Sequence, residues 1–135
     1  MAKEITNYFH IDTSAPEGLR ELNKAIAQEL GYEVRLKNGS QWWLVRDGLG
    51  QECNTSYKDA WDAVPRYSTD LNAAMSLINP VSRVLFKLYA NPHLNEDNRW
   101  CAVLDGAPDG KWTCNDSTPA LAICGVWLMW KQAQS

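Results

Sequence analysis

Asn115–Trp130 reads N-D-S-T-P-A-L-A-I-C-G-V-W-L-M-W, and it predicts a helix that is buried on more than one side. The side-chain oxygen of Thr118 can accept hydrogen bonds from the free N–H groups of a first helical turn. Pro119 fits the first helical position because it has no N–H to lose there. The residues that follow are apolar almost all the way round, whereas a surface helix keeps a polar face. We therefore expect a helix over residues 119–132 that contacts other elements on several faces.

The length and composition predict one globular domain over residues 1–135. Hydrophobic residues make up 45% of the chain and charged residues 21%, which is normal for a folded protein and argues against disorder. The 13 basic and 16 acidic residues give a formal charge of −3, unlike the strongly basic footprint of a duplex-DNA-binding protein. Duplex DNA is therefore an unexpected partner, although a local basic pocket for a small anionic ligand is compatible with this charge.

The cysteine pattern favours a reducing, cytoplasmic setting. None of the four cysteines has the Cys-x-x-Cys spacing of a zinc site. We expect mostly buried free thiols, with a disulfide between Cys101 and Cys114 as the alternative. The longest apolar run, Ala120–Trp130, is shorter than the about 20 residues of a membrane span, and the polar first residues show no secretory signal. We therefore expect no membrane association, and the pattern implies no metal or other cofactor.

A helix is predicted over residues 15–30, where leucine and isoleucine recur at helical spacing. Ser14 and Glu17 stand three residues apart, as in a capping box. Gly31 is a natural stop for this helix.

Another helix is predicted to begin at Tyr67–Asp70. We expect Ser68 or Thr69 to cap it and Asp70 to lie in the first turn, where the helix dipole favours negative charge. The following apolar face ends before Pro80.

Strand-forming residues predict a small antiparallel sheet. Its first two strands form a hairpin around the turn at residues 37–40. We expect residues 51–66 to be irregular, apart from a single helical turn. About three helices with one small antiparallel sheet predict an α+β fold, an α-β-α sandwich. The expected strands are residues 5–11, 32–36, 41–46, 84–90, 99–105 and 111–114.

The order of these segments resembles the phage ABA-sandwich proteins, which are small products of tailed phages and prophages with no assigned role. The resemblance rests on Tyr67-Ser68-Thr69-Asp70 opening one helix and on Thr118-Pro119-Ala120-Leu121-Ala122-Ile123-Cys124 opening another. It covers residues 15–132, and the segment before them is a departure because relatives often begin near the first helix. The resemblance implies an α-β-α layered fold and supplies no catalytic residues.

Two groups of aromatic and basic residues are candidate binding sites. On a strand, the adjacent Trp42 and Trp43 must point to opposite faces, so one can enter the core while the other stays at an edge. Beside Arg46, an exposed Trp could stack on a base near a phosphate or anchor a protein partner. The alternative for both groups is ordinary packing over neighbouring elements. The second group consists of Trp61, Arg66 and Tyr67.

The residue pattern favours binding without catalysis. His10, near Asp12, and the distant His93 are the only histidines, and each is most simply a solvated side chain. Cys124 stands in the middle of an apolar run and is expected in the core. No phosphate-binding glycine loop or nucleophile elbow is present.

The resemblance and the composition together suggest a phage accessory protein that acts in the cytoplasm of an infected bacterium. We expect it to inhibit a host defence protein or to sequester a nucleotide-derived immune signal, and the net negative charge favours the protein target. The very apolar last helix suggests a homodimer. The alternative from another class is a small enzyme that degrades or modifies a nucleotide signal, with His10 and Asp12 in a cleft.

Overall fold

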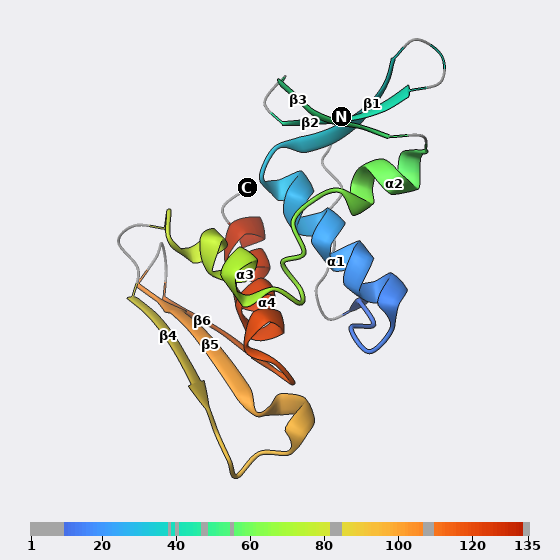
Figure 1. Cartoon of the computed structure of the whole chain (residues 1–135). Helices are drawn as coiled ribbons and strands as arrows, with labels where there is room; N and C mark the ends of the chain where they lie inside the picture. The colour runs from blue at the N-terminus through green and yellow to red at the C-terminus, as the bar shows by residue number, and fades with distance from the viewer. Residues whose placement is uncertain are drawn as a thin grey trace. The chain divides into compact units, whose positions relative to one another are not determined.

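The computed structural model describes residues 10–37, 39, 41–46, 49–54, 56–81, 85–106 and 110–133. Its internal contacts divide the chain into two compact units, Asp12–Pro65 and the part from Arg66 onward together with the residues up to Ile11. The described residues form four α-helices and two three-stranded antiparallel sheets (Figure 1). The predicted α+β class is confirmed, with two sheets and four helices where one sheet and about three helices were expected. The prediction of a single domain stays a prediction.

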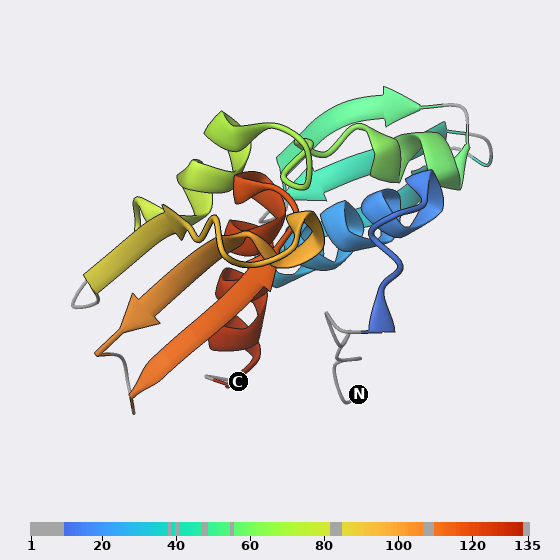
Figure 2. The same cartoon turned by 90° about the horizontal axis from the view of Figure 1, so that it is seen from below.

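The Asp12–Pro65 unit packs two helices on a sheet. Its sheet has the order β1-β2-β3. Leu44 of β2 packs with Ala27 of α1, Trp61 of α2 and Val64 in the core of this unit. Burying these apolar side chains holds both helices to the sheet (Figure 2). The elements are α1 (Pro16–Glu29), β1 (Tyr32–Lys37), β2 (Gln41–Arg46), β3 (Leu49–Asn54) and α2 (Tyr57–Asp62).

The hairpin of β1 and β2 is confirmed, and the single helical turn expected within residues 51–66, at 59–64, overlaps α2. The prediction that the start of this segment is irregular is wrong, because it belongs to β3. β3 pairs along β2, from Trp42 opposite Asn54 to Arg46 opposite Leu49. The polar residues of this segment have low strand propensity, but pairing with β2 outweighs that low propensity. The Ser56 hydroxyl then accepts a hydrogen bond from the Asp59 N–H at 3.1 Å and caps α2.

The start of α1 differs from the predicted capping box. The helix begins at Pro16, and Ala15 occupies the N-cap position without a side-chain hydrogen bond. The Ser14 side chain instead donates to Asp12 Oδ1 at 2.5 Å, and the Ser14 N–H donates to the same oxygen at 3.1 Å. Both hydrogen bonds hold the pKa of Asp12 below its ordinary value. The Ser14 hydroxyl therefore bonds to Asp12 in a local turn and is not used to cap the helix, as it would be in a capping box.

The second unit packs one helix on a sheet and another helix on the first. Its sheet has the order β4-β5-β6, and both pairs of strands are antiparallel. Helix α4 contacts β5 and β6, and α3 contacts α4 (Figure 1). The elements are α3 (Leu71–Ile78), β4 (Leu85–Ala90), a 3-10 turn η2 (Glu96–Asn98), β5 (Trp100–Asp105), β6 (Lys111–Asp116) and α4 (Pro119–Ala133).

Helix α4 confirms the prediction made from its sequence. The Leu121 N–H donates to Thr118 Oγ1 at 3.2 Å, and Pro119 is the first helical residue. Every residue from Ala120 to Leu128 is buried. β5 and β6 cover one side of the helix and α3 covers another, so its apolar surface is satisfied within the chain.

The predicted cap of α3 is wrong by one or two residues. Asp70 is the N-cap, and its carboxylate accepts from the N–H groups of Asn72 at 2.9 Å and Ala73 at 3.4 Å. An aspartate at this position accepts hydrogen bonds from the free helix N–H groups, and the positive end of the helix dipole stabilises its negative charge. Ser68 is buried instead, and Thr69 lies in the turn before the helix.

Cys101, Cys114 and Cys124 are buried and form no disulfide, so the alternative of a Cys101–Cys114 disulfide is excluded. In the β5–β6 register Ala102 stands opposite Cys114 and Cys101 stands opposite Asn115. The predicted strand at residues 5–11 falls mostly outside the described residues. Among the helices of the described ranges, none is long and apolar enough to cross a membrane.

Candidate functional site

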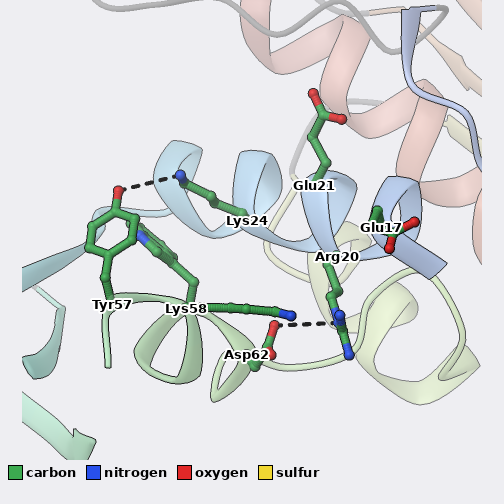
Figure 3. A pocket seen from close by; sticks show the side chains of 8 residues that line it. Glu17, Arg20, Glu21, Lys24, Tyr57, Lys58 and Asp62 are labelled. Atoms are coloured by element: carbon green, nitrogen blue, oxygen red, sulfur yellow. Dashed lines mark hydrogen bonds and ion pairs between the residues drawn. The ribbon is translucent and has the colours of Figure 1, made fainter. Parts of the chain in front are cut away.

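A cleft of about 370 Å³ lies between α1 and α2 (Figure 3). On α1 its lining residues recur at helical spacing, because positions three and four apart share one face. On α2 they occupy two adjacent turns. The lining residues are Glu17, Arg20, Glu21, Lys24, Tyr57, Lys58, Trp61 and Asp62.

Aromatic rings form the apolar part of this cleft. Tyr57 and Trp61 meet edge to face with ring centroids 6.5 Å apart. Trp42 of β2 also meets Tyr57 edge to face, with centroids 5.5 Å apart and planes at 80°. Edge-to-face pairs at such distances are worth about 0.5–1.5 kcal/mol beyond area burial. Tyr57 therefore contacts two tryptophans while 47% of its own surface stays exposed.

Lys24 links the two helices across the cleft. Its ammonium lies 3.4 Å from the Tyr57 hydroxyl, as a long hydrogen bond. The same ammonium lies 5.2 Å from the Tyr57 ring centroid and 5.3 Å from the Trp61 ring centroid. Cation–π contacts of this kind contribute about 0.5–1 kcal/mol at exposed sites and more when desolvated. The two aromatic rings thus help to hold the Lys24 ammonium in position.

Trp61 contributes a buried donor. The residue is only 8% exposed, and its indole N–H has no hydrogen-bond partner in the part of the chain that the structure describes. A buried donor without a partner is costly, typically about 1–3 kcal/mol. This buried donor belongs to a residue of the cleft wall.

Acidic and basic side chains in the cleft balance. Three are acidic and three are basic. Arg20 Nε lies 3.7 Å from Asp62 Oδ1, and both side chains are well exposed. Such a surface pair contributes about 0–1 kcal/mol. The charged side chains of the cleft therefore carry no net excess of positive charge.

The ionisation of Tyr57 responds to this environment. The Trp61 N–H dipole, which falls short of hydrogen-bond geometry, is the largest cause that lowers the pKa of Tyr57. Partial burial opposes this effect, and the Lys24 ammonium adds to the lowering by hydrogen bonding and by charge. The donors around this hydroxyl therefore favour a negatively charged oxygen.

The structure brings two of the sequence-predicted site residues to the cleft. Trp61 lines it, and Trp42 packs on its tyrosine. Trp43 is half-buried on β2, and Arg46 lies over the Tyr32 ring at 5.1 Å. Neither lines this cleft.

Arg66 and Tyr67 belong to the other unit. Arg66 is exposed, whereas Tyr67 is 3% exposed. The binding roles predicted for Trp43, Arg46, Arg66 and Tyr67 stay predictions.

Sequence reasoning missed Lys24 and Tyr57 as site residues. The polar face of the 15–30 helix, with charged residues at 17, 20, 21 and 24, was a readable signal. That face resembles any solvated helix surface, however, and α2 was expected only as a single helical turn within an irregular segment. Only the packing of α2 beside α1 turns these residues into the two walls of one cleft.

The residues considered for catalysis are not among those that line this cleft. His93 is exposed, and its backbone N–H donates to Asn91 Oδ1 at 3.0 Å. Cys124 is fully buried and donates to the Tyr67 carbonyl at 3.1 Å, and burial raises the pKa of its thiol far above the ordinary value. Within the described ranges, no group of three His, Cys, Asp or Glu side chains is placed to hold a metal ion.

No family model matches the chain, and no curated protein matches its sequence. Among solved structures, the chain is similar to a phage protein from Bacillus cereus ATCC 14579, known from a crystal structure at 2.0 Å. The TM-score is 0.58 and the sequence identity is 20%, over 84% of this chain and 87% of that chain. The chain therefore shares the fold of a phage protein from Bacillus cereus.

Proposed function

We propose that this chain is a phage accessory protein that binds a host defence protein through the α1–α2 cleft and blocks it, in the cytoplasm of the infected bacterium. The observation that carries the proposal is a cleft in which two aromatic rings lie among three acidic and three basic side chains. Aromatic and charged side chains of this kind dominate the hot spots of protein interfaces. The fold shared with a phage protein supports the setting.

The charge balance of the cleft favours a protein partner over a nucleotide. A phosphate group requires several converging cations, because carboxylates nearby would repel it. Glu17, Glu21 and Asp62 line the same space as the three basic side chains. A protein surface that carries both signs of charge can complement such a cleft.

The experiment measures protection of a phage from host defence. The chain is expressed in bacteria that carry a panel of defence systems, and the plaque counts of a sensitive phage are compared with and without it. We expect rescue against at least one system, and loss of rescue in the Trp61→Phe and Lys24→Gln variants. Lys87→Gln, an exposed lysine on β4 outside the cleft, is the matched control and should keep full rescue.

A second measurement separates the alternatives. The purified chain is incubated with a panel of cyclic nucleotides, and the mixture is analysed after heat denaturation. Release of an intact bound nucleotide would support a nucleotide sponge, and a chemically changed nucleotide would support an enzyme. Either outcome would overturn the protein-blocking proposal, as would rescue that survives in both cleft variants. Sedimentation of the purified chain tests the predicted homodimer, to which α4 lends no support because the chain itself covers its apolar surface.

A further inference from the structure

An acidic and a basic side chain of α1 lie toward opposite ends of the α1–α2 cleft. Lys24 follows Glu17 by seven residues, about two helical turns, while Glu21 stands between them, three residues before Lys24. At 1.5 Å per residue, Glu17 and Lys24 are about 10 Å apart along the helix axis. Figure 3 shows Lys24 and Tyr57 at one end of the cleft and Glu17 at the other. A ligand that spans the cleft therefore meets Lys24 at one end and Glu17 at the other, where Arg20, Lys58 and Asp62 also lie.

Three hydrogen-bond donors meet at the basic end. The Lys24 ammonium lies 3.4 Å from the Tyr57 hydroxyl and 5.3 Å from the Trp61 ring centroid. The Trp61 N–H is buried and has no partner among the described residues, and Trp61 is one of the residues that line the cleft. A carboxylate can accept from an ammonium, a hydroxyl and an indole N–H together, and charge-assisted hydrogen bonds are the strong ones. This end is built to receive a negatively charged oxygen.

The acidic end offers two carboxylates. Glu17 and Glu21 are exposed and lie one turn apart on the same face of α1. Arg20 lies between them but is directed to Asp62 at 3.7 Å. Within the described part of the chain, neither glutamate has an ion-pair partner. Two neighbouring carboxylates of this kind attract a cationic side chain.

Resting on the proposed function, we propose that the partner inserts an extended segment carrying one acidic and one basic residue about three positions apart. The acidic side chain binds at Lys24, Tyr57 and Trp61, and the basic side chain binds at Glu17 and Glu21. The spacing follows from the cleft, because an extended chain advances about 3.3–3.6 Å per residue and the two ends are about 10 Å apart. The cleft thus selects segments by the separation between one acidic and one basic residue.

The test uses the full chain and short alanine-glycine peptides that carry one glutamate and one lysine at separations of one to five positions. Binding is followed by NMR through the indole N–H signal of Trp61, which is assigned by its loss in Trp61→Phe. We expect the peptide with a separation of three to bind about fivefold tighter than the shortest and longest separations. Peptides with two lysines or two glutamates are the composition controls.

Charge-swap variants make the inference specific. In Glu17→Lys/Glu21→Lys the preference should switch to peptides with two glutamates at the same separation. Lys24→Gln should lose the preference for glutamate, while the control variant Lys87→Gln keeps the original one. Trp61→Phe, followed by anisotropy of a labelled peptide, should bind about tenfold more weakly, because the acceptor loses a buried donor.

The outcomes separate this inference from the proposed function. If the chain binds no peptide at any separation, or binds all with equal affinity, the spacing inference is wrong. Rescue of the phage that still depends on Trp61 and Lys24 would then leave the blocking function standing. Conversely, affinity that depends on the peptide separation, together with full phage rescue by the Trp61→Phe and Lys24→Gln variants, would support the peptide site and reject the defence role.

Discussion

The Lys24 ammonium lies 3.4 Å from the Tyr57 hydroxyl and 5.2 Å from the centre of the same ring, so one lysine of α1 contacts one tyrosine of α2 in two ways. Trp42 packs on the same tyrosine from β2. Three elements of the Asp12–Pro65 unit therefore converge on one exposed phenol. The stability of the unit and the chemistry of its cleft both depend on this arrangement.

Tyr57 should make the protein more stable at alkaline pH. The Trp61 N–H and then the Lys24 ammonium lower its pKa in the folded state below the ordinary value of 10.0, against an opposing effect of burial. The Tyr57 hydroxyl therefore binds its proton more tightly in the unfolded chain than in the folded one. The contribution of Tyr57 to the free energy of unfolding consequently appears as the pH rises from the lowered pKa to about 10. It disappears as the pH falls through the lowered pKa.

Urea unfolding over this pH range measures the effect. Tyr57→Phe should lack the alkaline gain that the unaltered chain shows. Tyr89→Phe is the comparison with the opposite sign, because hydrogen bonding and charge from Cys101 raise the pKa of Tyr89, so its contribution is lost as the pH rises. Parallel pH profiles for the unaltered chain and Tyr57→Phe would contradict the prediction.

Gly18→Ala should destabilise the protein by about 2–4 kcal/mol. A Cβ at this position would lie 1.7 Å from the backbone oxygen of Asp12 and 2.5 Å from its carbonyl carbon, so the turn before α1 would have to move. Gly110→Ala provides the contrast, since a Cβ there meets nothing within 4 Å and only its φ of +114° is strained. Urea unfolding should show a clearly larger loss for Gly18→Ala, and equal losses would show that the close approach is not important.

Asp70→Ala should cost about 1 kcal/mol, the usual value for a lost N-cap. The variant removes the acceptor for the N–H groups of Asn72 and Ala73 at the start of α3. Thr69→Ala, next to it and exposed, should change the free energy of unfolding by less than about 0.5 kcal/mol. The reverse order of effects in thermal or urea unfolding would restore Thr69 as the cap.

Leu128→Ala should destabilise the protein by about 2–5 kcal/mol, because it opens a cavity beneath α4. Leu128 is fully buried, whereas Leu85 of β4 is 57% exposed. Leu85→Ala removes the same atoms from a largely solvated site and should cost far less. Similar losses for the two variants in urea unfolding would mean that α4 is covered less fully than its burial shows.

Trp42→Ala should weaken binding at the cleft, although Trp42 does not line it. Its ring supports Tyr57 at a centroid distance of 5.5 Å, and loss of an edge-to-face pair worth about 0.5–1.5 kcal/mol corresponds to about two- to tenfold weaker binding. Trp43→Ala alters the opposite face of β2 and should leave peptide affinity unchanged. If Trp43→Ala weakens binding more than Trp42→Ala, the site lies on the face of the hairpin away from α2.

Elements with their own start and stop residues were predictable. Thr118, Pro119 and an all-round apolar run define α4, and the apolar spacing before Gly31 defines α1. These signals act within a few residues of one another, so they can be read along the chain. The capping details at Ser14 and Asp70 were not predictable, because two neighbouring side chains competed for each role and the local turn chose between them.

The sequence by itself determined the α+β class, the buried helix at residues 119–132 and the β1–β2 hairpin, because periodicity and end signals are local properties. Only the tertiary structure decided that a polar segment pairs as β3, since the partner strand supplies its hydrogen bonds. The same holds for the cleft. Lys24 and Tyr57 are 33 residues apart in the chain, and neither carries a local signal for the other. Packing of α2 beside α1 brings them together, because burying Trp61 and Leu44 in one core places both helices on one sheet.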